Sequence, residues 1–140
     1  MCLDTITQTA EPGRFINLKA SERIGYKVVT RGGNIFATSS FQIFLQMDEW
    51  TSDPNDYDIA AGIGGVYRTG FHCFATLKGA RAWAIPDETI LMVKMHRVVA
   101  IGKQRGKVIV ARKIKLLKVV VEGTVMKRPS VTAVFAQNSC

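Results

Sequence analysis

Two arginines in the second half of the chain interrupt rows of apolar residues, and their side chains are the ones best suited to bind an anion. Every second residue of 91–101 is apolar except Arg97, and every second residue of 108–116 is apolar except Arg112. Because successive side chains of a strand point to opposite faces, this alternation places both guanidinium groups on the apolar face. A guanidinium is rarely buried without a partner, and it matches the geometry of phosphate. The pattern predicts a phosphate-bearing ligand, unless a β-bulge or strand end carries the arginines to solvent or a carboxylate pairs with them.

A positive surface surrounds these two arginines. Between Thr89 and Val121 there are nine Lys or Arg residues and no acid. Such a surface can follow a nucleic-acid backbone or close over a nucleotide, and either interaction would weaken with salt. The alternative is that solvated lysines keep two long strands from pairing with other chains. The candidate ligand-binding residues are Arg97, Arg112, Lys103, Arg105, Lys113, His72, Phe71 and Tyr67.

The residue types needed for catalysis or for a metal site are sparse. His72 lies among aromatic residues and His96 lies on the polar side of a basic strand, and neither has a Ser or Cys at motif spacing. The three cysteines have no short C-x-x-C spacing, and the acidic segment 48–58 lacks the glutamate that completes a calcium loop. We therefore expect neither a cofactor nor a metal, and the pattern favours a protein that is not an enzyme.

The elements that would position these residues are mostly strands. β-branched and aromatic residues surround the glycine pair at 32–33, and two longer runs, 89–101 and 107–121, are joined by a glycine-flanked loop. Thr76 is a suitable N-cap for a short helix that ends before Pro86. The sequence therefore predicts an α+β fold, mostly an antiparallel β-sheet built from two hairpins, near 24–45 and 89–121, with one short helix.

Length and charge limit the organisation of the chain. Its 140 residues suit a single domain, 1–140, in which we expect 1–20 to be a loosely ordered arm or short edge segment and 124–140 an edge strand or tail. The net charge of +8 is concentrated in the second half. No apolar run is long enough to cross a bilayer, and residues 1–14 have no signal-peptide core, so we expect a cytoplasmic protein with no membrane partner. Two long apolar strands in a small chain also predict a homo-oligomer.

The spacing of several short motifs resembles a known arrangement. These motifs are Gly25-Tyr26-Lys27-Val28, Gly70-Phe71-His72-x-Phe74, and the run from Val98-Val99-Ala100-x-Gly102 to Val110-Ala111-Arg112. Together they resemble small uncharacterised phage and mobile-element proteins. The resemblance implies a product made in the host cytoplasm during infection. It also implies a role against host defence, in which some such proteins are oligomers that sequester nucleotide second messengers.

A second resemblance is to a minimal ADP-ribosyltransferase. It consists of an early tyrosine strand, Arg31, Thr38-Ser39-Ser40, a Gly-Phe-His strand and a closing hairpin. The late catalytic glutamate of that family would have to be Glu88 or Glu122, neither of which lies in a Glu-x-Glu motif.

Three functional hypotheses follow from these patterns. The first is a phage-type basic protein that binds a phosphate-bearing ligand, a nucleotide or cyclic oligonucleotide signal. The second is direct binding of DNA or RNA. The third is an ADP-ribosyltransferase-like or nucleotide-cleaving enzyme.

Overall fold

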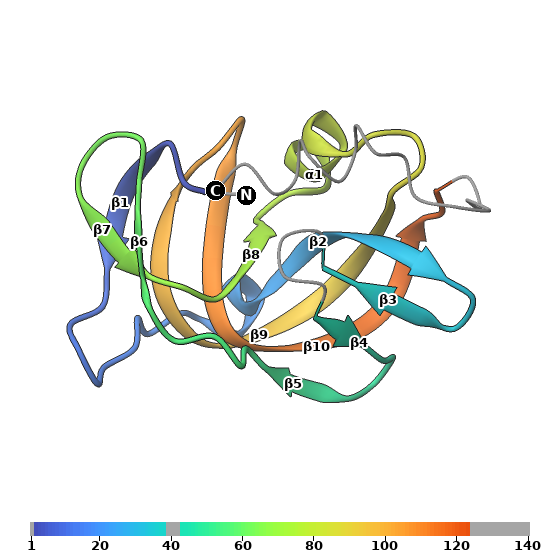
Figure 1. Cartoon of the computed structure of the whole chain (residues 1–140), viewed down its shortest axis with the longest axis horizontal. Coiled ribbons are helices and arrows are strands. Elements are labelled where there is room, and N and C mark those ends of the chain that lie inside the picture. The colour runs from blue at the N-terminus through green and yellow to red at the C-terminus, as the bar shows by residue number, and fades with distance from the viewer. Residues whose placement is uncertain (1, 39–42, 124–140) are drawn as a thin grey trace.

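The computed structural model describes residues 2–38 and 43–123, and most of them lie in antiparallel strands (Figure 1). The α+β prediction is confirmed at this level, since the described residues contain one short α-helix beside a large antiparallel sheet. The elements in chain order are β1 (Thr5–Thr9), the 3-10 helix η1 (Ala20–Arg23), β2 (Ile24–Gly32), β3 (Ile35–Ala37), β4 (Phe44–Leu45), β5 (Trp50–Ser52), β6 (Asp58–Ala60), β7 (Val66–Arg68), β8 (Phe71–Phe74), α1 (Leu77–Trp83), β9 (Thr89–Lys103) and β10 (Lys107–Val121).

The long strands β9 and β10 organise the sheet. They pair with each other over most of their length, and the short turn after Lys103 joins them. The other edge of β9 pairs with β2 near its start and with β1 near its end. The other edge of β10 pairs with β8 and then with β5. Because β2 also pairs with β8 at Tyr26 and Phe74, the strands β9, β10, β8 and β2 form a closed ring of pairings.

The two-hairpin description in the prediction is not confirmed. The main sheet has eight strands, and the order β1-β9-β10-β8-β2-β3-β4 brings together segments that are distant in the sequence. The strands β6 and β7 form a separate two-stranded sheet. Loop lengths and alternation indicate strands that are adjacent in the chain, whereas pairings such as β2 with β9 depend on tertiary packing.

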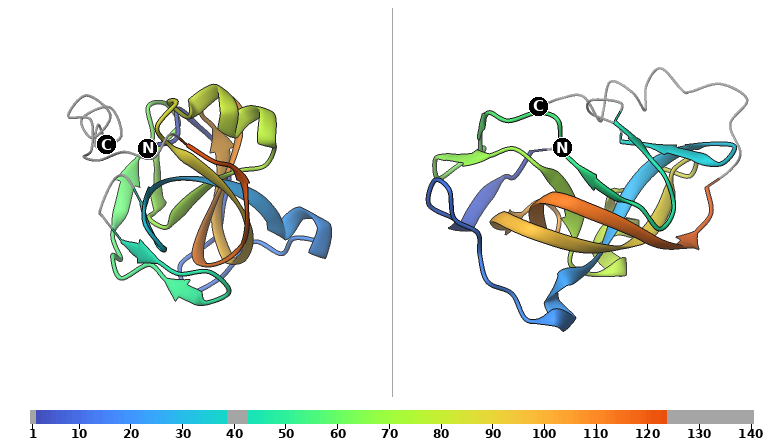
Figure 2. Two further views of the ribbon diagram at one scale, coloured as in Figure 1. Left: turned by 90° about the vertical axis from the view of Figure 1, so that its right-hand side faces the viewer. Right: turned by 90° about the horizontal axis from the view of Figure 1, so that it is seen from below.

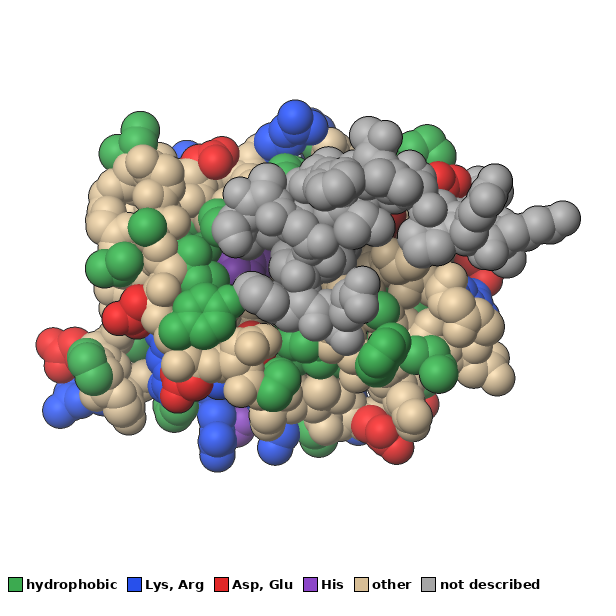
Figure 3. Space-filling view, in the orientation of Figure 1, with side chains coloured by type: hydrophobic (Ala, Val, Ile, Leu, Met, Phe, Trp, Pro, Cys, Tyr) green, Lys and Arg blue, Asp and Glu red, His purple; other side chains and the backbone are tan. Residues whose placement is uncertain are grey.

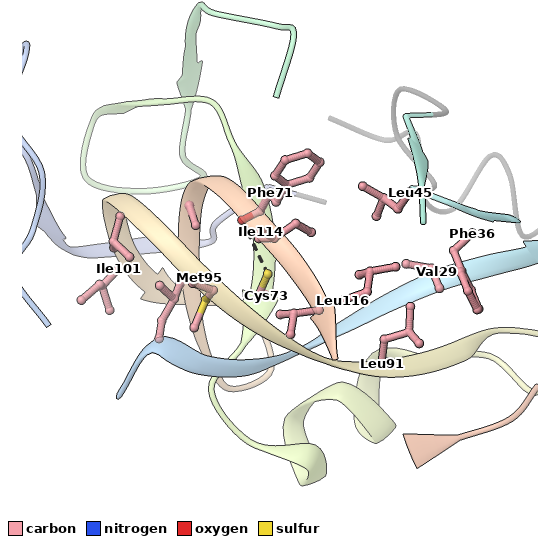
Figure 4. Close-up of a cluster of buried hydrophobic side chains, with 14 residues drawn as sticks. Val29, Phe36, Leu45, Phe71, Cys73, Leu91, Met95, Ile101, Ile114 and Leu116 are labelled. Atoms are coloured by element: carbon pink, nitrogen blue, oxygen red, sulfur yellow. Dashed lines mark hydrogen bonds between the residues drawn. The ribbon is translucent and has the colours of Figure 1, made fainter. Parts of the chain in front are cut away.

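Apolar side chains fill two clusters. The first contains Val29, Leu91, Met95 and Leu116, and its side chains converge from β2, β9 and β10 (Figure 4). The second contains Phe74 and Ala80, and it includes the residues through which α1 packs on the sheet. Thr76 caps α1 by accepting a hydrogen bond at Oγ1 from the Gly79 N–H, as the sequence predicts.

The first twenty residues contribute an edge strand. β1 pairs with the end of β9, and the Leu3 side chain is only 1% exposed. Gly102 permits this packing, because a Cβ atom there would lie 2.2 Å from the Thr5 carbonyl oxygen. The predicted strand or tail at 124–140 lies outside the described residues, and the single domain over 1–140 stays a prediction.

The segment between β1 and β2 runs along the outside of the sheet. It leads to η1, which projects at the periphery of the molecule (Figure 2). No helix among residues 2–38 and 43–123 has the length and apolar character needed to span a membrane. The same residues contain no group of three or more side chains placed to hold a metal ion.

Candidate phosphate-binding surface

Strands β9, β10 and β5 present a set of side chains that we name the basic face: Lys94, His96, Lys113, Lys115 and Trp50. Their positions follow from strand register. Lys115 lies opposite Lys94 on β9 and opposite Trp50 on β5, and Lys113 lies opposite His96. Side chains of directly opposed residues share a face of the sheet. The buried pair Ile114 and Met95 lies between them and points to the other face.

The arrangement of cations on the basic face costs stability. Like charges directly opposite each other on neighbouring strands are destabilising, and Lys94 lies directly opposite Lys115. Within the described part of the chain, none of the three lysines of the face forms an ion pair with a carboxylate. Blue and purple side chains lie together along the lower edge in Figure 3, where Figure 1 places β9, β10 and β5. A bound polyanion would remove this repulsion.

Trp50 provides an aromatic surface within the basic face. Its side chain is 41% exposed. The Lys113 ammonium lies 5.8 Å from the centre of its ring system, and the His96 ring makes an edge contact at 5.9 Å between centroids. Aromatic rings among cations are what a nucleic-acid strand meets on proteins that bind it without sequence preference.

Arg97 lies next to the basic face, because the backbone departs from regular alternation at this residue. Met95 and Val98 both belong to the first core cluster although they are three residues apart. The intervening shift occurs at Arg97, whose φ is +59°, a left-handed conformation that costs a residue with a Cβ atom roughly 1–2 kcal/mol. His96 and Arg97 are therefore both exposed. Arg97 therefore does not lie on the apolar face; as in the alternative considered from the sequence, an irregular strand carries it to solvent.

A groove of about 240 Å³ opens beside Arg97 along the edge of β9. The Arg97 guanidinium lies 5.8 Å from the centre of the Phe15 ring, and Phe15 is 43% exposed. Arg23 also lines the groove and donates from Nε to the Leu18 carbonyl, which leaves its two terminal nitrogens available. The full lining is Phe15, Ile16, Asn17, Leu18, Arg23, Met95, His96, Arg97 and Val98.

Arg112 is a structural anchor. Its guanidinium donates to three backbone carbonyls: to Asn55 and Thr69 from Nη1, both at 2.7 Å, and to Asp53 from Nη2 at 2.9 Å. The Asp53 carboxylate lies 3.8 Å from Nη1, and both side chains are largely buried. Arg112 therefore holds the segment after β5 and the residue after β7 against β10, and three of its donors are already used.

His72 and Tyr67 belong to a buried hydrogen-bond network. The Gly70 carbonyl can only accept, so His72 Nδ1 carries the proton in the 3.1 Å contact with it. His72 Nε2 then accepts from the Tyr67 hydroxyl at 2.8 Å, and that hydroxyl accepts from the Leu3 N–H at 3.0 Å. Burial, followed by the nearby Lys27 ammonium, lowers the pKa of His72 to about 3. The imidazole is neutral and fully satisfied inside the protein.

Two further buried side chains lie close to this network. Phe71, a predicted ligand contact, is 2% exposed and belongs to the first core cluster. Lys27 is also buried, and its ammonium donates to the His72 carbonyl at 2.9 Å while burial lowers its pKa. Neither the aromatic ring nor the ammonium is open to a ligand.

The remaining predicted residues separate into two places. Lys113 belongs to the basic face. Lys103 and Arg105 lie at the turn between β9 and β10, where the Arg105 guanidinium lies 5.8 Å from the Trp83 ring centre and contacts the Ala82 carbonyl. Arg105 shares with Arg97 a positive φ, here +56°. The eight candidate residues therefore do not converge on one pocket.

The two candidates for the late catalytic glutamate of an ADP-ribosyltransferase, Glu88 and Glu122, lie in structural positions. Glu88 is 5% exposed and accepts a hydrogen bond from the Ile85 N–H. Glu122 forms an ion pair with Arg31 after the end of β10.

The chain matches no protein-family model, no curated protein and no solved structure.

The predicted ligand contacts omit Lys94 and Lys115, which the sequence assigns only to the positive surface, and they also omit Phe15, Arg23, His96 and Trp50. Phe15 and Arg23 lie in a segment without periodicity, so no pattern places them beside β9. Trp50 stands in a short acidic segment that is typical of a loop. The signal available for His96 was its place between Lys94 and Arg97 in an acid-free strand.

Proposed function

We propose that this protein binds a nucleic-acid strand through backbone phosphates lying along the basic face. The observation that carries the proposal is that Lys94 lies directly opposite Lys115, with the pair Lys113 and His96 beside them. Within the described residues, none of these lysines forms an ion pair with a carboxylate. Residues two positions apart on a strand are separated by about 6.5 Å, so the cations form rows along the sheet rather than a concave pocket. Rows of cations suit a repeating polyanion.

The sequestered nucleotide or cyclic oligonucleotide receives less support from the site. The groove volume of about 240 Å³ lies below the range of roughly 300–1,000 Å³ usual for sites that enclose a drug-sized ligand. Arg112, which would have to read the phosphates of a compact ligand, already donates to three carbonyls. The phage origin and anti-defence role implied by resemblance belong to this competing proposal.

The test compares two variants with the same change in net charge. The face variant replaces Lys94, Lys113 and Lys115 with Gln. The control variant replaces the exposed residues Lys78, Lys103 and Lys107, at α1 and the far end of the hairpin, with Gln. Fluorescence anisotropy with a labelled single-stranded oligonucleotide is measured over a series of salt concentrations. We expect the face variant to lower the slope of log affinity against log salt by about 2, since each phosphate contact on a single strand contributes about 0.7.

The control variant should keep most of the wild-type slope. Equal losses in the two variants would show that net charge alone attracts the strand, and would contradict the proposal. Failure of the wild-type protein to bind any strand, with tight binding of a mononucleotide or cyclic dinucleotide, would favour the sequestration alternative.

A further inference from the structure

We infer that the groove beside Arg97 takes one unpaired nucleobase of a bound strand, so that the surface selects single-stranded nucleic acid over duplex. The inference rests on the proposed function and adds to it the class of nucleic acid. It concerns a different set of side chains from the lysines of the basic face. The contacts that carry it are those of Phe15, Arg23 and Arg97.

The groove has the chemistry of a base site. Phe15 and Leu18 give it an apolar surface, while the amide of Asn17 and the guanidinium of Arg23 supply hydrogen-bonding groups at its edge. Unstacked bases bind to proteins by stacking on aromatic rings or guanidinium planes while their edges form hydrogen bonds. The Phe15 ring is exposed at 43% and has the Arg97 guanidinium over it, so both kinds of stacking surface are present.

The size and position of the groove limit the ligand to one base. A volume of about 240 Å³ accommodates a single ring system rather than a dinucleotide or a duplex edge. His96 belongs both to the groove lining and to the basic face, so the two surfaces are continuous. A strand whose phosphates lie on the lysines can therefore place a base in the groove. A base within a duplex is stacked and paired, and is not available for this contact.

The backbone at Arg97 supports a functional reason for this residue. A left-handed conformation suits Gly or Asn better than Arg, and irregular strand positions that redirect a side chain are common beside binding sites. The strained residue here carries a long cationic side chain that lines the groove. Arg105 has the same backbone conformation at the far end of the hairpin, which makes it a matched control.

The experiment uses the full chain and three single variants: Phe15→Ala, Arg97→Gly and Arg105→Gly. Three labelled probes of equal phosphate number are compared by anisotropy: a single strand, a strand with abasic sites, and a duplex. A single strand containing 2-aminopurine reports stacking by loss of its fluorescence. Urea unfolding of each variant accompanies the binding data.

The wild type should bind the single strand at least about fivefold more tightly than the abasic strand or the duplex. Phe15→Ala should remove that preference while leaving affinity for the abasic strand unchanged, and should restore 2-aminopurine fluorescence. Arg97→Gly should weaken binding of the single strand. Its urea unfolding midpoint should be no lower than that of the wild type, because glycine adopts the left-handed conformation without strain. Arg105→Gly should leave the preference intact.

Each other outcome has a distinct meaning. Equal affinity of the wild type for all three probes, or unchanged binding by Phe15→Ala, would overturn the base site while the proposed function stands. Loss of binding in the face variant together with no effect of Phe15→Ala would also overturn the base site alone. Absence of binding to every strand would overturn the proposed function, and the base site with it.

Discussion

Lowering the pH should destabilise this protein through His72. The folded-state pKa of His72 is lowered to about 3, whereas an unfolded chain has a histidine pKa near 6.5. Between these values the unfolded state binds one more proton than the folded state, so stability falls as the pH falls. One proton corresponds to about 1.4 kcal/mol per pH unit, and lowering the pH from 7 to 4 should therefore cost about 3 kcal/mol through this residue.

Urea unfolding followed by tryptophan fluorescence at a series of pH values measures this loss. Carboxylates also titrate in part of this range, so the comparison is with His72→Gln, which keeps an acceptor for the Tyr67 hydroxyl but cannot titrate. The variant should be less stable at pH 7 and should lose less stability on acidification. Tyr67→Phe removes the hydroxyl that links Leu3 to His72, and should cost about 1–3 kcal/mol while keeping the histidine's pH dependence.

Parallel stability curves for the wild type and His72→Gln between pH 7 and 4 would refute the reasoning. They would mean that His72 gains a proton in the folded protein as readily as in the unfolded chain. The neutral network of Leu3, Tyr67, His72 and Gly70 would then be wrong in its proton positions.

Two further outcomes are expected. Arg112→Ala should lower the free energy of unfolding in urea by about 3–5 kcal/mol, because it leaves three carbonyls and the buried Asp53 without their donor. The nucleic-acid affinity of the folded variant should stay within about twofold of the wild type. Unchanged stability with a large loss of affinity would show instead that Arg112 binds the ligand. The predicted homo-oligomer should dissociate in the variant Phe44→Lys, because Phe44 is 69% exposed on β4, at one end of the sheet order. A wild-type protein that sediments as a monomer would contradict the predicted oligomer.

The strands of the long hairpin and the short helix after Thr76 were predictable from sequence. Their signals are local, consisting of dense β-branched residues, a glycine-flanked turn and a threonine N-cap. The ring formed through β2 was not predictable, because it depends on β2 pairing with β9 and with β8, which are distant from it in the sequence. The alternation rule also failed at Arg97 and Arg112. It assumes a regular strand, and both strands shift phase there.

The phase shifts of the two strands occur at the same place. Ala111 and Ile114 of β10 both point into the first core cluster, as Met95 and Val98 of β9 do, and the register places Arg112 between the same flanking pairs as Arg97. A regular ribbon would aim both arginines into the first core cluster. The coordinated shift instead keeps apolar side chains in that cluster on either side of the irregularity, while Arg97 turns to solvent and the largely buried Arg112 turns to backbone carbonyls.

These shifts coincide with changes of strand partner on both outer edges of the hairpin. The partner of β10 changes from β8 to β5 at Arg112, and the carbonyls left at that junction are the ones Arg112 binds. The partner of β9 changes from β2 to β1 across the stretch that contains Arg97, where the single bridge between Ile16 and Val98 holds the chain. The groove beside Arg97 lies at this second junction. Two arginines at equivalent places in the ribbon therefore differ in surroundings, because Arg112 is covered by protein carbonyls whereas Arg97 lines a groove.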